Sequence, residues 1–172
     1  QGAAGGGAPL RWRHRPWWLA AALLLACGSG KPADAARQRL RTEVLTVRDA
    51  LRTQPSSPIL YYQLGQIYER YGVTDSATLA YEQSVGLHEA FPQAHARLAQ
   101  IYLDRGDTTR AIAAWQQAAR FSPQDVQSRN NLGFLLRKRG DLAGAEAAYR
   151  RALDLQPDFA EPLNNLGQVC RE

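Results

Sequence analysis

Apolar side chains return along this chain at a fixed interval of 34 residues. Four leucines stand in this register: Leu64, Leu98, Leu132 and Leu166. A glycine or alanine follows each leucine directly, and a tyrosine, leucine or cysteine stands three positions further on. A fixed period of this length predicts an array of helical units, each burying its apolar face against its neighbours. The alternative is a generic helical bundle with chance spacing, which four registered leucines disfavour.

The unit at 126–159 shows why the pattern predicts a helical hairpin. Leu132, Gly133 and Leu136 share one helix face, because their spacing is one and three residues. Gly140 and Asp141 then favour the end of that helix and the capped start of the next one. The second helix has its own apolar stripe at helical spacing, Ala145, Tyr149, Ala152 and Leu153. A proline beyond this stripe stops the helix.

This pattern resembles the tetratricopeptide repeat, whose consensus contains Leu-Gly, Tyr, Gly, Ala, an aromatic residue, Ala and Pro at fixed positions. The resemblance implies an all-α fold, an α-solenoid of helical hairpins that coil into a right-handed superhelix. It divides the chain into full units at 58–91, 92–125 and 126–159 and a partial unit at 160–172. The first unit departs from the consensus at Ser84, where alanine is expected, and at Glu89, where proline is expected.

Residues 1–26 predict a secretory signal peptide with a signal helix. Arg11, Arg13 and Arg15 form a positive stretch, and an uninterrupted apolar run occupies 17–26. No acidic residue precedes Asp34. A run of this length is too short to cross about 30 Å of hydrocarbon as a helix. It is therefore interpreted as the apolar core of a cleaved signal.

The apolar run ends in Leu24-Leu25-Ala26-Cys27, which resembles the bacterial lipobox. In that motif the signal is cut before the cysteine, which is acylated. The resemblance implies a lipid anchor at Cys27, followed by a tether at 27–34, in a protein that faces the periplasm from the outer membrane. The alternative is an ordinary cleaved signal with an incidental Cys27, which would leave a soluble periplasmic or secreted protein.

Residues 35–54 predict one helix that packs on the first repeat as an N-terminal cap. Apolar residues recur there at helical spacing: Ala36, Leu40, Val44, Val47 and Leu51. Val47 and Ala50 match second-helix positions of a preceding unit, whereas Glu43 stands where the repeat has a small residue.

The charge of the chain does not favour a nucleic-acid partner. The formal net charge is +5, but removing the three arginines of the signal lowers Lys+Arg from 21 to 18 against 16 Asp+Glu, leaving about +2. Nucleic-acid binding would require a basic stripe or an aromatic stacking platform, and neither is evident. No nucleic-acid binding is therefore expected.

No catalytic or metal-binding constellation is recognisable, so no enzymatic activity, metal or cofactor is expected. His88 and His95 are separated by a turn, and no cysteine or acidic residue stands at metal-ligand spacing from them. They are interpreted as surface or packing residues. Trp115 is predicted to pack between helices. Cys170 occupies an apolar packing position and is predicted to be a buried thiol.

The first helix of each unit lines the inner surface of the superhelix in the family, which implies a groove for a protein or extended peptide. Amides dominate the predicted face, and an amide can both donate and accept hydrogen bonds to a peptide backbone. The candidate groove residues are Gln63, Gln66, Arg97, Gln100, Asn131, Phe134, Lys138, Asn165 and Gln168. Asn131 and Asn165 stand in similar Asn-Asn-Leu-Gly segments, which resemble the asparagine ladder of peptide-binding members. The alternative is that both asparagines are solvated consensus residues.

Two hypotheses of function follow from the sequence. The first is a non-enzymatic lipoprotein that presents a protein-binding groove to the periplasm. The second is the N-terminal repeat module of a longer exported enzyme or cytochrome-like protein, whose active domain would lie beyond residue 172. The partial fourth unit and the absence of methionine favour the interpretation that this sequence is part of a longer chain. The partner, the pathway and the oligomeric state are left open.

Overall fold

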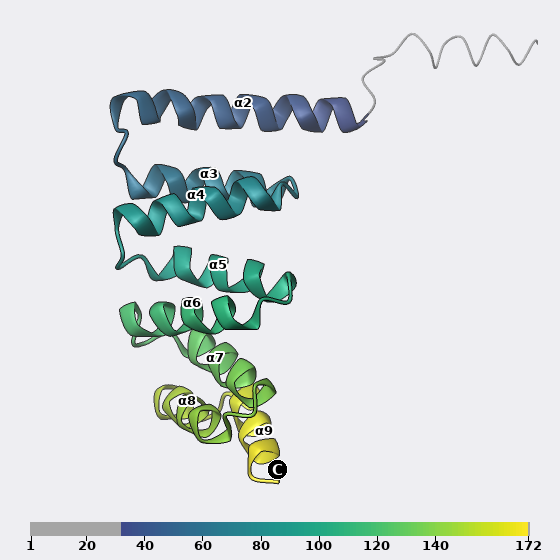
Figure 1. The fold of residues 1–172 in the computed structure, drawn as a ribbon, viewed down its shortest axis with the longest axis vertical. Helices are drawn as coiled ribbons and strands as arrows, with labels where there is room; N and C mark the ends of the chain where they lie inside the picture. The colour runs from purple at the N-terminus through teal and green to yellow at the C-terminus, as the bar shows by residue number, and fades with distance from the viewer. Residues whose placement is uncertain (1–31, 172) are drawn as a thin grey trace, which may run out of the picture. The chain divides into compact units, whose positions relative to one another are not determined.

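The computed structural model describes residues 32–171, which contain eight helices and no strand. The helices are α2 (Pro32–Thr53), α3 (Pro58–Arg70), α4 (Thr74–Leu87), α5 (Pro92–Asp104), α6 (Thr108–Phe121), α7 (Val126–Lys138), α8 (Leu142–Leu155) and α9 (Ala160–Val169), labelled in Figure 1. The predicted signal helix and Cys27 lie outside the described residues. Two compact units divide the chain, residues 1–37 and 38–172, and the packing described below lies within the second.

Helices of the second unit pack in chain order. Three hairpins, α3 with α4, α5 with α6 and α7 with α8, each occupy one repeat unit, and α9 begins the fourth (Figure 1). Each helix from α3 onward also contacts the next one along the chain. The all-α prediction and the prediction of stacked helical hairpins are therefore confirmed for the described residues. The right-handed superhelix remains a prediction.

The helix predicted at 35–54 is α2, which begins slightly earlier and ends one residue sooner. It packs on the first repeat through a single apolar stripe. Val44 of α2 is buried with Leu64 and Ile67 of α3, and Leu40, Val47 and Leu51 pack against the same cluster. The rest of α2 is mostly exposed and mainly polar, with Leu45 as an exposed apolar exception.

Each hairpin turns at a glycine in the left-handed region. Gly72, Gly106 and Gly140 have φ of 71°, 77° and 86°, a conformation that a side chain would strain. At the third turn, the Asp141 backbone N–H donates to the Leu136 carbonyl at 2.9 Å, which closes the helix end. The Asp141 side chain then accepts from the Gly144 backbone N–H at 2.9 Å, so it caps α8 as the sequence predicts.

A glycine on the first helix lets an aromatic ring of the second helix approach closely. A methyl group added to Gly65 would lie 2.5 Å from Tyr81 Cε1, and one added to Gly133 would lie 2.7 Å from Tyr149 Cε1. Both tyrosines are fully buried. Packing therefore explains the glycine of the Leu-Gly pair: the absence of a side chain leaves the space that the tyrosine ring occupies.

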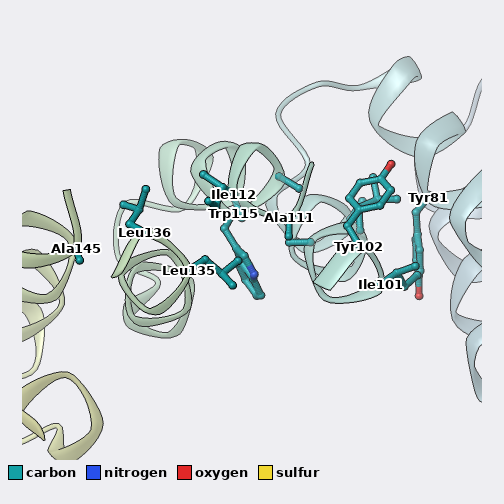
Figure 2. Packing of buried hydrophobic residues seen from close by; sticks show 14 of the residues in the cluster. Tyr81, Ile101, Tyr102, Ala111, Ile112, Trp115, Leu135, Leu136 and Ala145 are labelled. Carbon is teal, nitrogen blue, oxygen red and sulfur yellow. The ribbon is translucent and has the colours of Figure 1, made fainter. Parts of the chain in front are cut away.

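The registered leucines belong to the core. Leu64 and Leu98 are buried, and Leu132 and Leu166 are partly buried against the main cluster. A second registered set, three positions after these leucines, is also buried and was missed in the sequence: Ile67, Ile101, Leu135 and Val169. Figure 2 shows Trp115 with Leu135 in this cluster, as the packing role predicted for Trp115 requires.

Cys170 is exposed, so the prediction of a buried thiol is wrong. In the three full units, the corresponding residue is buried or partly buried in the core: Tyr68, Tyr102 and Leu136. No helix of the described residues covers this face of α9. Consistently, a methyl group added to Gly167 would meet nothing within 4 Å.

Candidate functional site

Every predicted groove residue is at least partly accessible, and all of them lie on the first helices α3, α5, α7 and α9. Seven of the nine line three hollows of similar volume. We call them the α2–α3 hollow (330 Å³), the central hollow (390 Å³) and the α7–α9 hollow (380 Å³). Lys138 and Gln168 line none of the three.

Gln63 and Gln66 line the α2–α3 hollow. Val47 of α2 and Arg70 of α3 border the same hollow. The Arg70 guanidinium is held by Glu43 of α2, with Nη1 2.8 Å from Oε2. The glutamate that departs from the repeat consensus therefore ties the N-terminal helix to the first repeat. Since the Arg70 side chain is largely exposed and that of Glu43 is only partly buried, this ion pair contributes little stability.

Arg97 and Gln100 line the central hollow, between α3, α5 and α7. Arg97 Nη1 lies 3.4 Å from Glu69 Oε1, and Tyr81 donates its hydroxyl proton to Glu69 Oε2 at 2.6 Å. Burial lowers the pKa of Arg97, but Glu69 and the Tyr62 hydroxyl raise it by more, so the net shift is upward. The guanidinium is therefore a fixed positive charge at the hollow.

The α7–α9 hollow contains the asparagine pair. Asn131 accepts a hydrogen bond at Oδ1 from Gln127 Nε2, at 3.2 Å, which leaves its amide N–H groups to donate elsewhere. Asn165 donates from Nδ2 to Asn130 Oδ1 at 3.2 Å, which leaves its carbonyl oxygen to accept. A donor and an acceptor therefore stand on neighbouring helices around one hollow.

Phe134 supplies an apolar surface to the same hollow. The Lys138 ammonium lies 4.8 Å from the centroid of its ring, a distance at which the cation and the π face attract each other. Lys138 therefore contributes to the site by holding the ring in place, although it does not line the hollow.

Two residues of the site were missed in the sequence, Asn130 and Glu69. Asn130 is buried and joins Asn165 to Glu161, donating from Nδ2 to Glu161 Oε2 at 2.9 Å. Glu69 fixes Arg97, as described above. Asn130 directly precedes Asn131, so the doubled asparagine was a usable signal. Glu69 carries no signal of its own in the repeat pattern.

Tyrosine hydroxyls bind carboxylates across adjacent helices. Tyr102 donates to Glu82 Oε1 at 2.7 Å, and burial followed by this hydrogen bond raises the pKa of Tyr102 to about 12. Burial and Glu69 likewise raise the pKa of Tyr81. These tyrosines thus stay neutral donors: Tyr81 joins the two helices of the first unit, and Tyr102 joins the second unit to the first.

Among residues 32–171, no group of His, Cys, Asp and Glu side chains is arranged to hold a metal ion. His95 is buried, with Nε2 2.8 Å from the Glu89 carbonyl oxygen, and it stacks on Phe121, while His88 is exposed. Within the same range, no helix combines the length and apolar character that crossing a membrane requires.

The family model of the tetratricopeptide repeat matches the chain at residues 62–126, 96–160 and 130–172. Together these segments span well over half of the chain, which therefore belongs to the tetratricopeptide repeat family. A search of curated proteins finds no significant match.

Solved structures share the fold. The crystal structure of MamA matches with a TM-score of 0.67 at 19% identity, over 83% of this chain and 84% of that one. YrrB, described as a repeat protein with an unusual peptide-binding site, matches with a TM-score of 0.67 at 18% identity, over 80% and 71%. The first repeat domain of Spaghetti (RPAP3), solved with an HSP90 peptide, matches with a TM-score of 0.60 at 19% identity, over 67% and 91%. At these identities the likeness shows the fold alone.

Proposed function

We propose that this protein is a non-enzymatic interaction scaffold, which binds an extended segment of a partner protein along its first-helix face. The observation that carries the proposal is the α7–α9 hollow. There the Asn131 amide and the Asn165 carbonyl offer one donor and one acceptor beside the Phe134 ring. An extended peptide exposes N–H and C=O groups that match such a pair.

The neighbouring hollows extend the same face. Arg97 and Gln100 in the central hollow offer a fixed cation and a further amide to the next residues of a bound peptide. Two proteins of the same fold support the proposal, since YrrB has a peptide-binding site and the RPAP3 domain was solved with a bound peptide.

The test is the selection of binding peptides from a random linear library on the purified full chain, followed by affinity measurements on variants. We expect the triple variant N131A/F134A/N165A to bind the selected peptides at least about tenfold more weakly. It loses one hydrogen bond on each asparagine and an apolar contact, each of which contributes about 1 kcal/mol.

A matched control carries the same kinds of change away from the first helices, L79A/Q83A/Q156A, with Leu79 and Gln83 on α4 and Gln156 directly after α8. These three residues are exposed and line none of the three hollows. The control should bind as the parent chain does. If both triple variants bind equally well while their circular dichroism is unchanged, the first-helix face is not the binding site.

We further propose that the protein is exported and anchored by lipid at Cys27, facing the periplasm from the outer membrane. The support is the order of residues in the sequence: three arginines, an apolar run, and a small residue directly before the cysteine. A soluble periplasmic or secreted protein is the alternative outcome.

A further inference from the structure

Arginines that lie between neighbouring units usually have an acidic partner. Arg97 pairs with Glu69, and Arg105 Nη2 lies 2.6 Å from Asp75 Oδ1. Three other arginines, Arg120 on α6, Arg129 on α7 and Arg151 on α8, form no ion pair within residues 32–171. These three line one hollow of 410 Å³, which we call the arginine hollow.

Two of these guanidinium groups are already held in place. Arg129 Nη2 donates to the Pro123 carbonyl oxygen at 2.7 Å, and the Arg120 guanidinium lies 5.3 Å from the centroid of the Phe121 ring. The Arg129 Nε–H is buried and meets no acceptor within the described residues. A buried donor without a partner costs free energy, which an anion in the hollow would recover.

No acidic residue lines the arginine hollow. Its remaining lining consists of Gln116, Ala119, Pro123 and Leu132. The formal charge around it is therefore +3, from the three arginines alone. Uncompensated guanidinium groups that share a hollow repel each other unless an anion binds between them.

The preceding junction of the repeat provides an internal comparison, because each lining position recurs 34 residues earlier. In place of Arg120, Arg129 and Arg151, the preceding junction has Gly86, His95 and Gln117. In place of Gln116 and Pro123, it has the acidic residues Glu82 and Glu89. The formal charge of these equivalents is −2, with histidine neutral. The arginine hollow is thus a feature of this chain at one junction, and the repeat architecture does not require it.

We propose that the arginine hollow binds a phosphate group, either free inorganic phosphate or the phosphate of a small ester. A guanidinium presents a planar fork of N–H donors that matches two oxygens of an oxyanion. One carboxylate has only two oxygens and satisfies one fork, whereas a tetrahedral phosphate offers enough oxygens to engage all three arginines. Its charge of about −1.5 to −2 at neutral pH also complements the arginines.

The test measures binding to the purified full chain by isothermal titration calorimetry at constant ionic strength. The probes are inorganic phosphate, glycerol 3-phosphate and acetate. We expect saturable binding of at least one phosphate probe, and binding at least about tenfold weaker in R120Q/R129Q/R151Q, because charge-assisted hydrogen bonds are lost. The tighter of the two phosphate probes identifies the source of the group.

The matched control R39Q/R41Q/R48Q removes the same charge from exposed positions of α2 and should bind phosphate as the parent chain does. Should the first triple variant misfold by circular dichroism, R151Q alone serves, since Arg151 is exposed and its change should weaken binding about fivefold. Equal binding by the arginine variants and the control, no saturable phosphate binding, or equally tight acetate binding would each overturn the proposal. The groove variant N131A/F134A/N165A should bind phosphate normally, so the two proposals fail independently.

Discussion

The close contact between Gly133 and the Tyr149 ring makes a sharp prediction about stability. Replacing Gly133 with alanine places a methyl group 2.7 Å from Tyr149 Cε1 and 2.9 Å from Cδ1. The ring is fully buried, so it cannot swing into solvent to make room. Gly167 occupies the same position in α9, but a methyl group there would meet nothing within 4 Å.

The expected free-energy changes of the two variants have opposite signs. Alanine in place of glycine inside a helix contributes about 0.5–1 kcal/mol, because the unfolded chain loses freedom and helix propensity rises. G167A should show this gain. In G133A, overpacking a buried contact costs about 1–3 kcal/mol, which outweighs the gain. A net destabilisation of roughly 1–2 kcal/mol is expected.

The stability of both variants is measured by urea unfolding, followed by circular dichroism. Because repeat arrays do not always unfold in one step, the urea midpoints are compared only where the slope of the transition equals that of the parent chain. Combining G133A with Y149A removes the ring and should abolish the penalty of the added methyl group. The steric explanation is refuted if G133A is as stable as G167A, or if its cost persists without the ring.

Two further predictions concern the second hairpin and the N-terminal segment. The Asp107 carboxylate caps α6. Hydrogen bonds from the backbone N–H of Arg110 and then from its side chain lower the pKa of Asp107. The cap therefore stabilises the fold fully above the ordinary Asp pKa, and this stabilisation is lost as the pH falls through the lowered pKa of the folded state. D107A should therefore lower the urea midpoint at neutral pH, and this difference should vanish in acid; an undiminished difference in acid would count against the cap. For Cys27, the full chain expressed in a Gram-negative host should fractionate with membranes and C27S should not, and a C27S protein that stays with the membrane would contradict the lipid anchor.

Much of the fold could be predicted because it rests on local periodicity. The leucine register, the glycine at each turn and the aspartate caps act within a single hairpin, where sequence spacing translates directly into one helix face. The buried set at Ile67, Ile101, Leu135 and Val169 was missed, because it faces a neighbouring helix that only the stacking of units brings close. Exposure of Cys170 was missed for a related reason, since burial at that position depends on a second helix.

Of the two proposed binding sites, the first-helix face could be predicted from the sequence and the arginine hollow could not. The amides of the predicted face recur at repeat positions, so their shared location on the first helices could be expected from the sequence. The arginine hollow could not be expected, because Arg120, Arg129 and Arg151 come from three helices and occupy positions that vary between units. Only the packing of α6, α7 and α8 brings them around one hollow.

The most direct test of the scaffold hypothesis maps a selected peptide onto the protein by amide chemical shifts in solution. The peptide is titrated into the isotope-labelled full chain. The account predicts that the largest shifts fall on α3, α5, α7 and α9, with the side-chain amides of Asn131 and Asn165 among them. Shifts confined to the second helices α4, α6 and α8, with both asparagines unmoved, would contradict it.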